Sequence, residues 1–365
     1  MFNYSAQYFY DRYELAPTPP ALFDGQFMRK TNKAAITDMF PHEETNVASI
    51  VGGKYVIDGG YLLHALVWTS PATFKEICCQ YINFLKKRWP NGVLVFDGYS
   101  SERPTTKAAE QQRRSAKRVC TEVEIGPNIH VNVGQADFLS SSKNKAGLIE
   151  ILVQELTSNG YEVKQAEEDA DTLVIRTVFE VCRRNPTVLI GNDTDLLVML
   201  IARTPKNRRI EMLHPATSDT AGKLYKISEV QDKIGDMKDV LLFAHAISGG
   251  DKTAAIFRVG KIRPYRLLEK RADLREEIKN SFNKPNCDKK QLEEVAEKFI
   301  MALYPDGSKF DCMDKLRYHL YHRAHARQAA TASFDLATIA PSKAATQQKA
   351  RRTYLQVLID SINVS

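Results

Sequence analysis

Residues 54–60 have the sequence Lys-Tyr-Val-Ile-Asp-Gly-Gly, and residues 93–98 have the sequence Val-Leu-Val-Phe-Asp-Gly. In each stretch a short apolar run, typical of a buried strand, ends at an aspartate. Residues 74–89 between them have the pattern of an amphipathic helix. Strand, helix and strand in this order indicate two parallel strands joined by a helical crossover.

The same alternation continues along the chain. Helices are predicted at residues 145–158 and 169–183, strands at 161–165 and 188–191, and a further helix, strand and helix up to residue 247. Beyond Gly250 the sequence predicts short helices only. We therefore expect an α/β fold of three layers, α/β/α, with a mainly parallel central sheet, followed by a helical C-terminal region.

Composition excludes several classes of protein. The 365 residues are 43% hydrophobic and 26% charged, which is ordinary for a soluble globular protein. No apolar run approaches the roughly 20 residues that a membrane span needs. Six cysteines occur without a Cys-x-x-Cys pair, so a disulfide framework or a cysteine zinc site is not indicated. We expect an intracellular protein with no membrane partner.

The charge distribution indicates a polyanionic partner. Lysine and arginine outnumber aspartate and glutamate by 51 to 44, a formal net charge of +7. The basic residues cluster at 107–118, 261–271 and 349–352, whereas isolated aspartates end several apolar stretches. This segregation favours a nucleic acid as partner.

Seven aspartates follow strands or open helices of the predicted sheet. They are Asp58, Asp97, Asp169, Asp171, Asp193, Asp195 and Asp251. Ligands bind at the carboxyl edge of open parallel sheets, and we expect these side chains to converge there. For any one of them, a helix N-cap or a solvated turn is the simpler interpretation. Such a role does not explain several mutually repelling carboxylates at one edge, which cations would neutralise.

The ligand types indicate the metal. Carboxylate oxygens without a histidine or cysteine partner suit Mg²⁺ or Mn²⁺ better than zinc. Two such ions about 4 Å apart can activate a water and stabilise the leaving oxygen of a phosphodiester. The chemistry indicated is phosphoryl transfer to water.

The order of these motifs over residues 54–275 resembles the flap endonucleases of the PIN-like nuclease superfamily. The resemblance implies a nuclear, structure-specific 5′ nuclease acting on DNA, with two metal ions held by the seven aspartates. Asp169 and Asp171 stand where the eukaryotic flap endonucleases have glutamates. The implied domains are an N-terminal extension (1–53), a nuclease core (54–247), a helix-two-turn-helix element (248–275) and a helical C-terminal region (276–365).

A basic helix is expected at about residues 104–120. Lys107, Arg114 and Arg118 share one face, because a seven-residue step returns within about 20° on a helix. The resemblance makes it a gateway helix, with Lys107 and Arg114 at the scissile phosphate and Arg113, Lys117 and Arg118 binding nucleic acid. A merely solvated charged helix is the alternative.

Further nucleic-acid contacts are expected outside this helix. In the helix-two-turn-helix element the donors for backbone phosphates are Thr253, Arg258, Gly260, Lys261 and Arg263. The family's Gly-x-Gly turn is reduced to Val259-Gly260, which argues against a bound K⁺. Tyr61 and His64 follow Asp58 and are expected to stack on a base, with core packing as the alternative.

Two other functions stay open at this point. An RNA-directed PIN-type nuclease would need the same ligands, since these do not distinguish the sugar. The second is a nuclease-like scaffold that binds nucleic acid or protein, which would need none of the acidic residues. The presence of all seven aspartates argues against this scaffold. The pattern, with Pro-Ser-Lys-Ala-Ala at 341–345, also resembles uncharacterised invertebrate nuclease-like proteins, from which no function follows.

Overall fold

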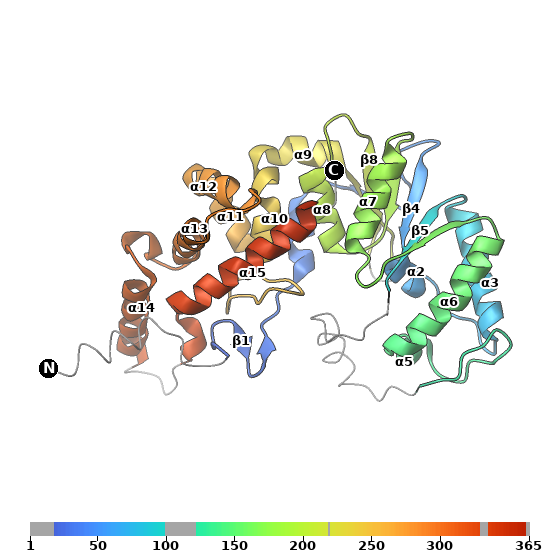
Figure 1. Cartoon of the computed structure of the whole chain (residues 1–365), viewed down its shortest axis with the longest axis horizontal. Helices are drawn as coiled ribbons and strands as arrows, with labels where there is room; N and C mark the ends of the chain where they lie inside the picture. The colour runs from blue at the N-terminus through green and yellow to red at the C-terminus, as the bar shows by residue number, and fades with distance from the viewer. Residues whose placement is uncertain (1–17, 99–121, 218–219, 329–334, 363–365) are drawn as a thin grey trace. The chain divides into compact units, whose positions relative to one another are not determined.

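The computed structural model describes residues 18–98, 122–217, 220–328 and 335–362. They form two compact units, shown in Figure 1. The sheet unit comprises Phe40–Lys233, and the helical unit comprises residues 18–39 together with Ile234–Ile362. No helix in these ranges is long and apolar enough to cross a membrane.

The described part of the sheet unit is built on a seven-stranded sheet in the order β3-β9-β8-β7-β4-β5-β6. The strands are β3 (Glu43–Glu44), β4 (Lys54–Asp58), β5 (Val93–Phe96), β6 (Glu162–Gln165), β7 (Thr187–Ile190), β8 (Ile210–His214) and β9 (Lys223–Lys226). Strands β8, β7, β4, β5 and β6 are parallel, and β9 and β3 add an antiparallel edge. The prediction of a mainly parallel sheet is confirmed, whereas the two short edge strands were not predicted.

Helices cover both faces of this sheet (Figure 1). The helices described in this part of the chain are α2 (Gly59–His64), α3 (Phe74–Arg88), α5 (Gln135–Phe138), α6 (Ser142–Ser158), α7 (Asp171–Cys182), α8 (Thr194–Arg203) and α9 (Ile227–Ile234). Helices α3 and α6 pack together on one face, and α7, which contacts β4, β7 and α8, lies on the other. The three-layer α/β/α arrangement is confirmed.

The strand register separates two buried rows of side chains. Leu94, Ile57, Ile190, Leu213 and Leu224 are paired across five neighbouring strands and face the cluster formed by α3 and α6. The residues preceding them on β4, β7 and β8 point to the opposite face, because successive strand residues alternate. Both rows are apolar, which explains why the strands are continuous hydrophobic runs.

Local signals set the ends of α3. The Thr73 hydroxyl accepts a hydrogen bond from the Glu76 amide at 3.3 Å, and the Glu76 carboxylate accepts one from the Thr73 amide at 2.7 Å. This reciprocal capping satisfies two amides that the first helical turn leaves without partners. Lys86, Lys87 and Arg88 occupy the last turn, where the helix dipole favours positive charge.

The helical unit contains two short strands and a series of helices. Its elements are β1 (Phe23–Asp24), β2 (Phe27–Met28), η1 (Lys33–Met39), η2 (Gly235–Val240), α10 (Leu241–Ile247), α11 (Ile262–Lys270), α12 (Ala272–Phe282), α13 (Lys289–Ala302), η3 (Gly307–Lys309), α14 (Met313–Gln328), η4 (Leu336–Thr338) and α15 (Lys343–Ile362). Phe243 packs edge-on against Phe282 and Phe299, with ring centroids 4.5 and 5.0 Å apart. Helix α15 packs on α10 and α13.

Part of the expected N-terminal extension is integrated into this unit. The Ala255 amide donates to the carbonyl of Arg29, and the Phe257 amide to that of Ala21, both at 2.8 Å. These bonds fix the β1–β2 hairpin to the loop between α10 and α11. The segment therefore contributes to the packing of the helical unit.

Candidate metal centre

The carboxyl edge of the sheet collects acidic residues from adjacent strands. Strands β7, β4, β5 and β6 are neighbours and run parallel, so their C-terminal ends lie side by side. Asp193, Asp58, Asp97 and Asp169 follow these four strands in that order. Topology alone therefore places four of the predicted ligands at one edge.

Asp58 ends β4 and caps α2. Its Oδ1 accepts a hydrogen bond from the Gly60 amide at 2.9 Å. A Cβ on Gly191 would lie 3.1 Å from the Asp58 Cβ, so the glycine after β7 leaves room for this side chain. A Cβ on Gly59 would overlap the Phe96 ring at 2.2 Å, which explains why glycine follows the aspartate.

Asp97 connects the end of β5 to the start of α7. Its Oδ1 accepts a hydrogen bond from the Ala170 amide at 3.0 Å, and its carbonyl accepts one from the Gln165 side chain at 3.2 Å. A Cβ on Gly98 would lie 2.1 Å from the Ala166 carbonyl oxygen. Gln165 was not predicted as a site residue, since a lone glutamine at a strand end carries no motif. These contacts hold the loop that carries Asp169.

Asp193 and Asp195 open α8. The Asp193 Oδ1 accepts a hydrogen bond from the Asp195 amide at 2.8 Å, as an N-cap does. Asp195 lies in the first turn of α8, and Asp171 lies in the first turn of α7. The capping interpretation thus holds for Asp58 and Asp193, but it does not account for the other acidic residues.

Asp171 has a raised pKa because it is buried among other acidic side chains. Burial raises the pKa of Asp171 well above its usual value, and the negative charges of Asp169, Asp193, Asp195 and Asp58 raise it further. A buried carboxyl surrounded by other carboxylates ionises with difficulty unless a cation compensates the charge. Five of the predicted ligands, Asp58, Asp169, Asp171, Asp193 and Asp195, therefore share one electrostatic site.

Asp58 is affected in the same way. Although its side chain is only partly shielded from solvent, the surrounding protein raises its pKa from 3.8 to about 7. Burial is the largest cause, and the charges of Asp193 and Asp97 add to it, while the hydrogen bond from Gly60 opposes it.

The donor set fits a hard divalent cation. The site offers carboxylate oxygens, the ligands that Mg²⁺ and Mn²⁺ prefer. Within the described ranges, no three Asp, Glu, His or Cys side chains meet closely enough to hold an ion directly. Ion binding therefore requires side-chain rotation or bridging waters, and Mg²⁺ commonly keeps several waters in protein sites.

Changing Asp58 to Asn tests this electrostatic description. Because the pKa of Asp58 is raised in the folded state, folding favours its protonated carboxyl. The contribution of this carboxyl to the free energy of unfolding is therefore complete below about pH 4 and is lost as pH rises through 7. Asn has no such loss and still caps α2. In EDTA we expect the free energies of urea unfolding of wild type and Asp58→Asn to diverge between about pH 4 and pH 7 in favour of the variant, by at most about 4 kcal/mol.

The exposed Asp232 on α9 provides the control for this experiment. Asp232→Asn should keep the wild-type pH dependence of unfolding. If Asp58→Asn also kept it, Asp58 would not carry the raised pKa described above.

Asp251 lies in the helical unit. Its side chain is exposed and pairs with Lys33, with 3.0 Å between Nζ and Oδ2. The Lys30 ammonium donates to the carbonyl of Gly250 at 3.3 Å. Its role as a seventh ligand stays a prediction.

Tyr61 and His64 differ in their surroundings. Tyr61 packs against the core, edge-on to Trp89 with ring centroids 6.2 Å apart, and burial raises its pKa to about 12. His64 is exposed at the end of α2, and partial burial followed by the charge of Lys145 lowers its pKa. His64 is the more exposed of the two, and the stacking role of both residues stays a prediction.

Two residues of the helix-two-turn-helix element that were expected to contact phosphate are instead buried. Thr253 and Lys261 are each only 1% exposed. The Thr253 hydroxyl donates to the Ala246 carbonyl at 2.7 Å, and the Lys261 ammonium donates to the His245 carbonyl at 2.6 Å. Both side chains stabilise the α10–α11 connection because their donors satisfy buried carbonyls at the end of α10.

The other members of this predicted set are at the surface. Arg258, Gly260 and Arg263 are exposed. The Arg258 guanidinium lies over the Phe257 ring at 5.0 Å, and the Arg263 guanidinium donates to the Leu303 carbonyl. Their phosphate contacts stay predictions.

The basic helix expected at about residues 104–120 lies outside the described residues. This concerns Lys107, Arg113, Arg114, Lys117 and Arg118.

The fold and its acidic edge define a three-layer α/β protein with a carboxylate cluster at the C-terminal ends of parallel strands. No protein-family model matches the chain, and no curated protein matches it. Among solved structures, the catalytic core of Rad2 is similar at 12% identity and a TM-score of 0.41, over 66% of this chain and 65% of that chain. The chain thus spans just under two thirds of that Rad2 core.

Two further solved structures are similar over most of their lengths. Flap endonuclease-1 from Methanococcus jannaschii is 15% identical with a TM-score of 0.41, over 89% of this chain and 98% of that chain. The T5 D15 protein, co-crystallised with metal ions, is 14% identical with a TM-score of 0.39, over 84% and 98%. The solved structures similar to this chain thus include a flap endonuclease, and the likeness concerns the fold.

Proposed function

We propose that the protein is a metal-dependent nuclease that hydrolyses phosphodiester bonds in nucleic acid. The observation that carries the proposal is the raised pKa of Asp171 and Asp58, caused by burial and by neighbouring aspartates. A cluster of this kind costs stability without a cation, which fits a metal site better than a structural one. The order of acidic motifs, which resembles that of the flap endonucleases, supports the same function.

The mechanism follows from the positions of the side chains. Asp58, Asp171 and Asp193 would hold the metal, together with Asp97, Asp169 and Asp195. Two divalent ions bound there would supply an activated water and stabilise charge on the attacking and leaving oxygens. The capping bonds of Asp58 and Asp193 hold one oxygen of each carboxylate at a backbone amide.

The remaining residues would position the nucleic acid. Lys107 and Arg114 would contact the scissile phosphate, and exposed His64 would contact the adjoining nucleotide. Arg258 and Arg263 would bind the duplex backbone away from the cut, as basic side chains and backbone amides commonly do. We favour branched or 5′-ended DNA as the substrate and the nucleus as its location.

A cleavage panel tests this function. Labelled flap, fork, single-stranded DNA and RNA substrates would be incubated with Mg²⁺, Mn²⁺ or EDTA. We expect cleavage of at least one branched or 5′-ended DNA with either metal and none in EDTA, because the carboxylates alone cannot activate water. Stronger cleavage of RNA would favour the RNA-directed nuclease.

The panel also addresses the alternative of a binding scaffold. Binding of these substrates without cleavage in either metal would contradict the nuclease and support the scaffold. Cleavage that persists in EDTA would contradict a metal-dependent reaction.

A further inference from the structure

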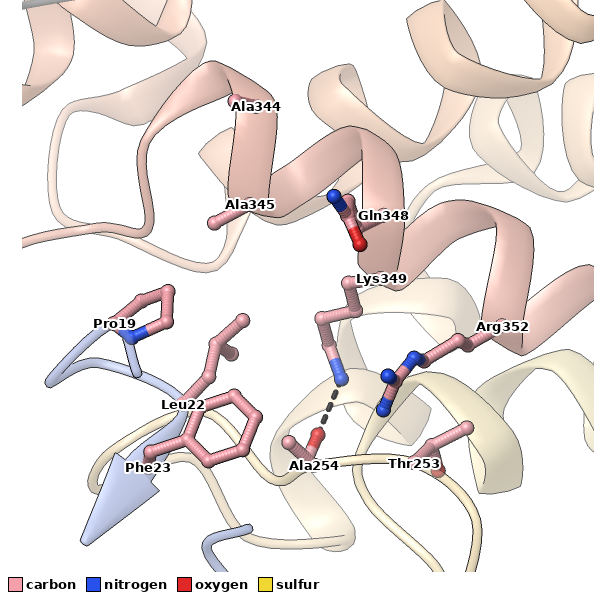
Figure 2. Close-up of a pocket in the computed structure, with 10 residues that line it drawn as sticks. All are labelled: Pro19, Leu22, Phe23, Thr253, Ala254, Ala344, Ala345, Gln348, Lys349 and Arg352. Carbon is pink, nitrogen blue, oxygen red and sulfur yellow. Dashed lines mark hydrogen bonds between the residues drawn. The ribbon is translucent and has the colours of Figure 1, made fainter. Parts of the chain in front are cut away.

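A pocket of about 330 Å³ lies within the helical unit, and Thr253 is the one predicted site residue among its described lining residues. Figure 2 shows it between the N-terminal segment, the α10–α11 loop and α15. Leu22 and Phe23 form an apolar wall, and Lys349 and Arg352 extend from α15 on the other side. Its volume is at the lower end of the range for ligand pockets, so it suits a small molecule.

Lys349 is a buried cation in this pocket. Its side chain is 4% exposed, and its ammonium donates a hydrogen bond to the Ala254 carbonyl (Figure 2). An ammonium has three donors, and a neutral carbonyl compensates none of its charge. Buried cations are normally paired with an anion, since desolvation is otherwise unfavourable.

Arg352 adds a second positive charge beside the first. It follows Lys349 by three positions on α15, which places both on one face of the helix. The hydrogen bond from the Arg352 guanidinium goes to the Met28 sulfur at 3.7 Å, which is a weak acceptor. Burial, followed by the charge of Arg352, lowers the pKa of Lys349 to about 7.

No aspartate or glutamate is among the described residues that line the pocket. The two neighbouring basic side chains therefore have no acidic partner among the described lining residues. The stable complement is an anion with several acceptor oxygens, which both side chains can reach together. The apolar wall opposite favours an anion attached to an apolar group.

We propose that this pocket binds a small organic anion, a phosphate ester or a carboxylate. Lys349 and Arg352 hold the charged group, and the apolar part lies against Leu22 and Phe23.

Calorimetric titration of the full chain tests this proposal with four probes: phenyl phosphate, benzoate, inorganic phosphate and phenol. We expect phenyl phosphate or benzoate to bind more tightly than inorganic phosphate and neutral phenol, and the preferred probe distinguishes the two anions. Lys349→Met and Arg352→Gln should each weaken this binding by at least about tenfold, because charged hydrogen bonds are strong.

Arg351→Gln is the matched control. It removes the same charge from the adjacent position of α15, where Arg351 pairs with Glu293 at 2.6 Å. This variant should bind the probes as wild type does. Arg352 is exposed, so Arg352→Gln should stay folded. It therefore tests the proposal even if Lys349→Met fails to fold.

Three outcomes would overturn the proposal. The first is no binding of phenyl phosphate or benzoate, and the second is unchanged binding in Arg352→Gln. The third is that duplex DNA displaces phenyl phosphate from the wild-type chain but does not bind Arg352→Gln. This result would mean that the pocket binds the phosphates of a nucleic-acid backbone.

Discussion

Asp193→Asn is expected to reduce cleavage by more than about a hundredfold, since even residues that only support metal ligands contribute 10- to 100-fold. Asn keeps the oxygen that accepts the Asp195 amide at 2.8 Å, so α8 stays capped. The change removes one negative charge from the cluster around Asp171. The measurement is the single-turnover rate at saturating enzyme with Mg²⁺, beside thermal unfolding with and without metal.

The unfolding data separate a lost ligand from a damaged fold. Without metal the variant should unfold at the same temperature as wild type or higher, because mutual repulsion is reduced. Asp232→Asn should cleave at the wild-type rate, since Asp232 is exposed on α9. Wild-type cleavage by Asp193→Asn would contradict a metal-binding role for the turn after β7.

Lys107→Ala is expected to lower the single-turnover rate by about 10²- to 10³-fold, a magnitude typical of one group that stabilises transition-state charge. A cation directed at the scissile phosphate acts most strongly at the transition state, so substrate affinity should change little. Single-turnover cleavage is measured with and without Lys107→Ala in the otherwise wild-type chain. Binding is measured at several salt concentrations with and without Lys107→Ala in an Asp193→Asn background.

Arg258→Ala provides the comparison for Lys107→Ala. If Arg258 contacts a phosphate away from the cut, Arg258→Ala should weaken binding and leave the cleavage rate unchanged. The slope of the logarithm of the binding constant against the logarithm of the salt concentration should fall by about one unit. The same result for Lys107→Ala would remove it from the catalytic residues and make the basic helix a binding surface.

The fold was largely predictable because its signals are local. Val93 to Phe96 form a fully buried strand, and such strands appear in the sequence as continuous apolar runs. Thr73 and Glu76 have the spacing of a capping box. The antiparallel strand β9 was missed, since Lys223–Lys226 has only four residues and a lysine at each end, which leaves a weak apolar signal.

The site was predictable in part for the same reason. Asp58 and Asp97 follow apolar strands directly, and the parallel order of those strands brings both to one edge. The roles of Thr253 and Lys261 were not predictable, because a hydroxyl or an ammonium near a loop has the same sequence signal whether it faces solvent or a buried carbonyl. Only the three-dimensional structure places Ala246 and His245 as their acceptors.

The sequence by itself determined the succession of strands and helices and the acidic residues at their junctions, since both depend on neighbours along the chain. Tertiary structure decided which charges interact. The high pKa of Asp171 and the low pKa of Lys349 both arise from burial and from nearby charges of the same sign. A charged side chain is buried only when distant segments pack around it, and local sequence patterns do not show which charges these segments bring together.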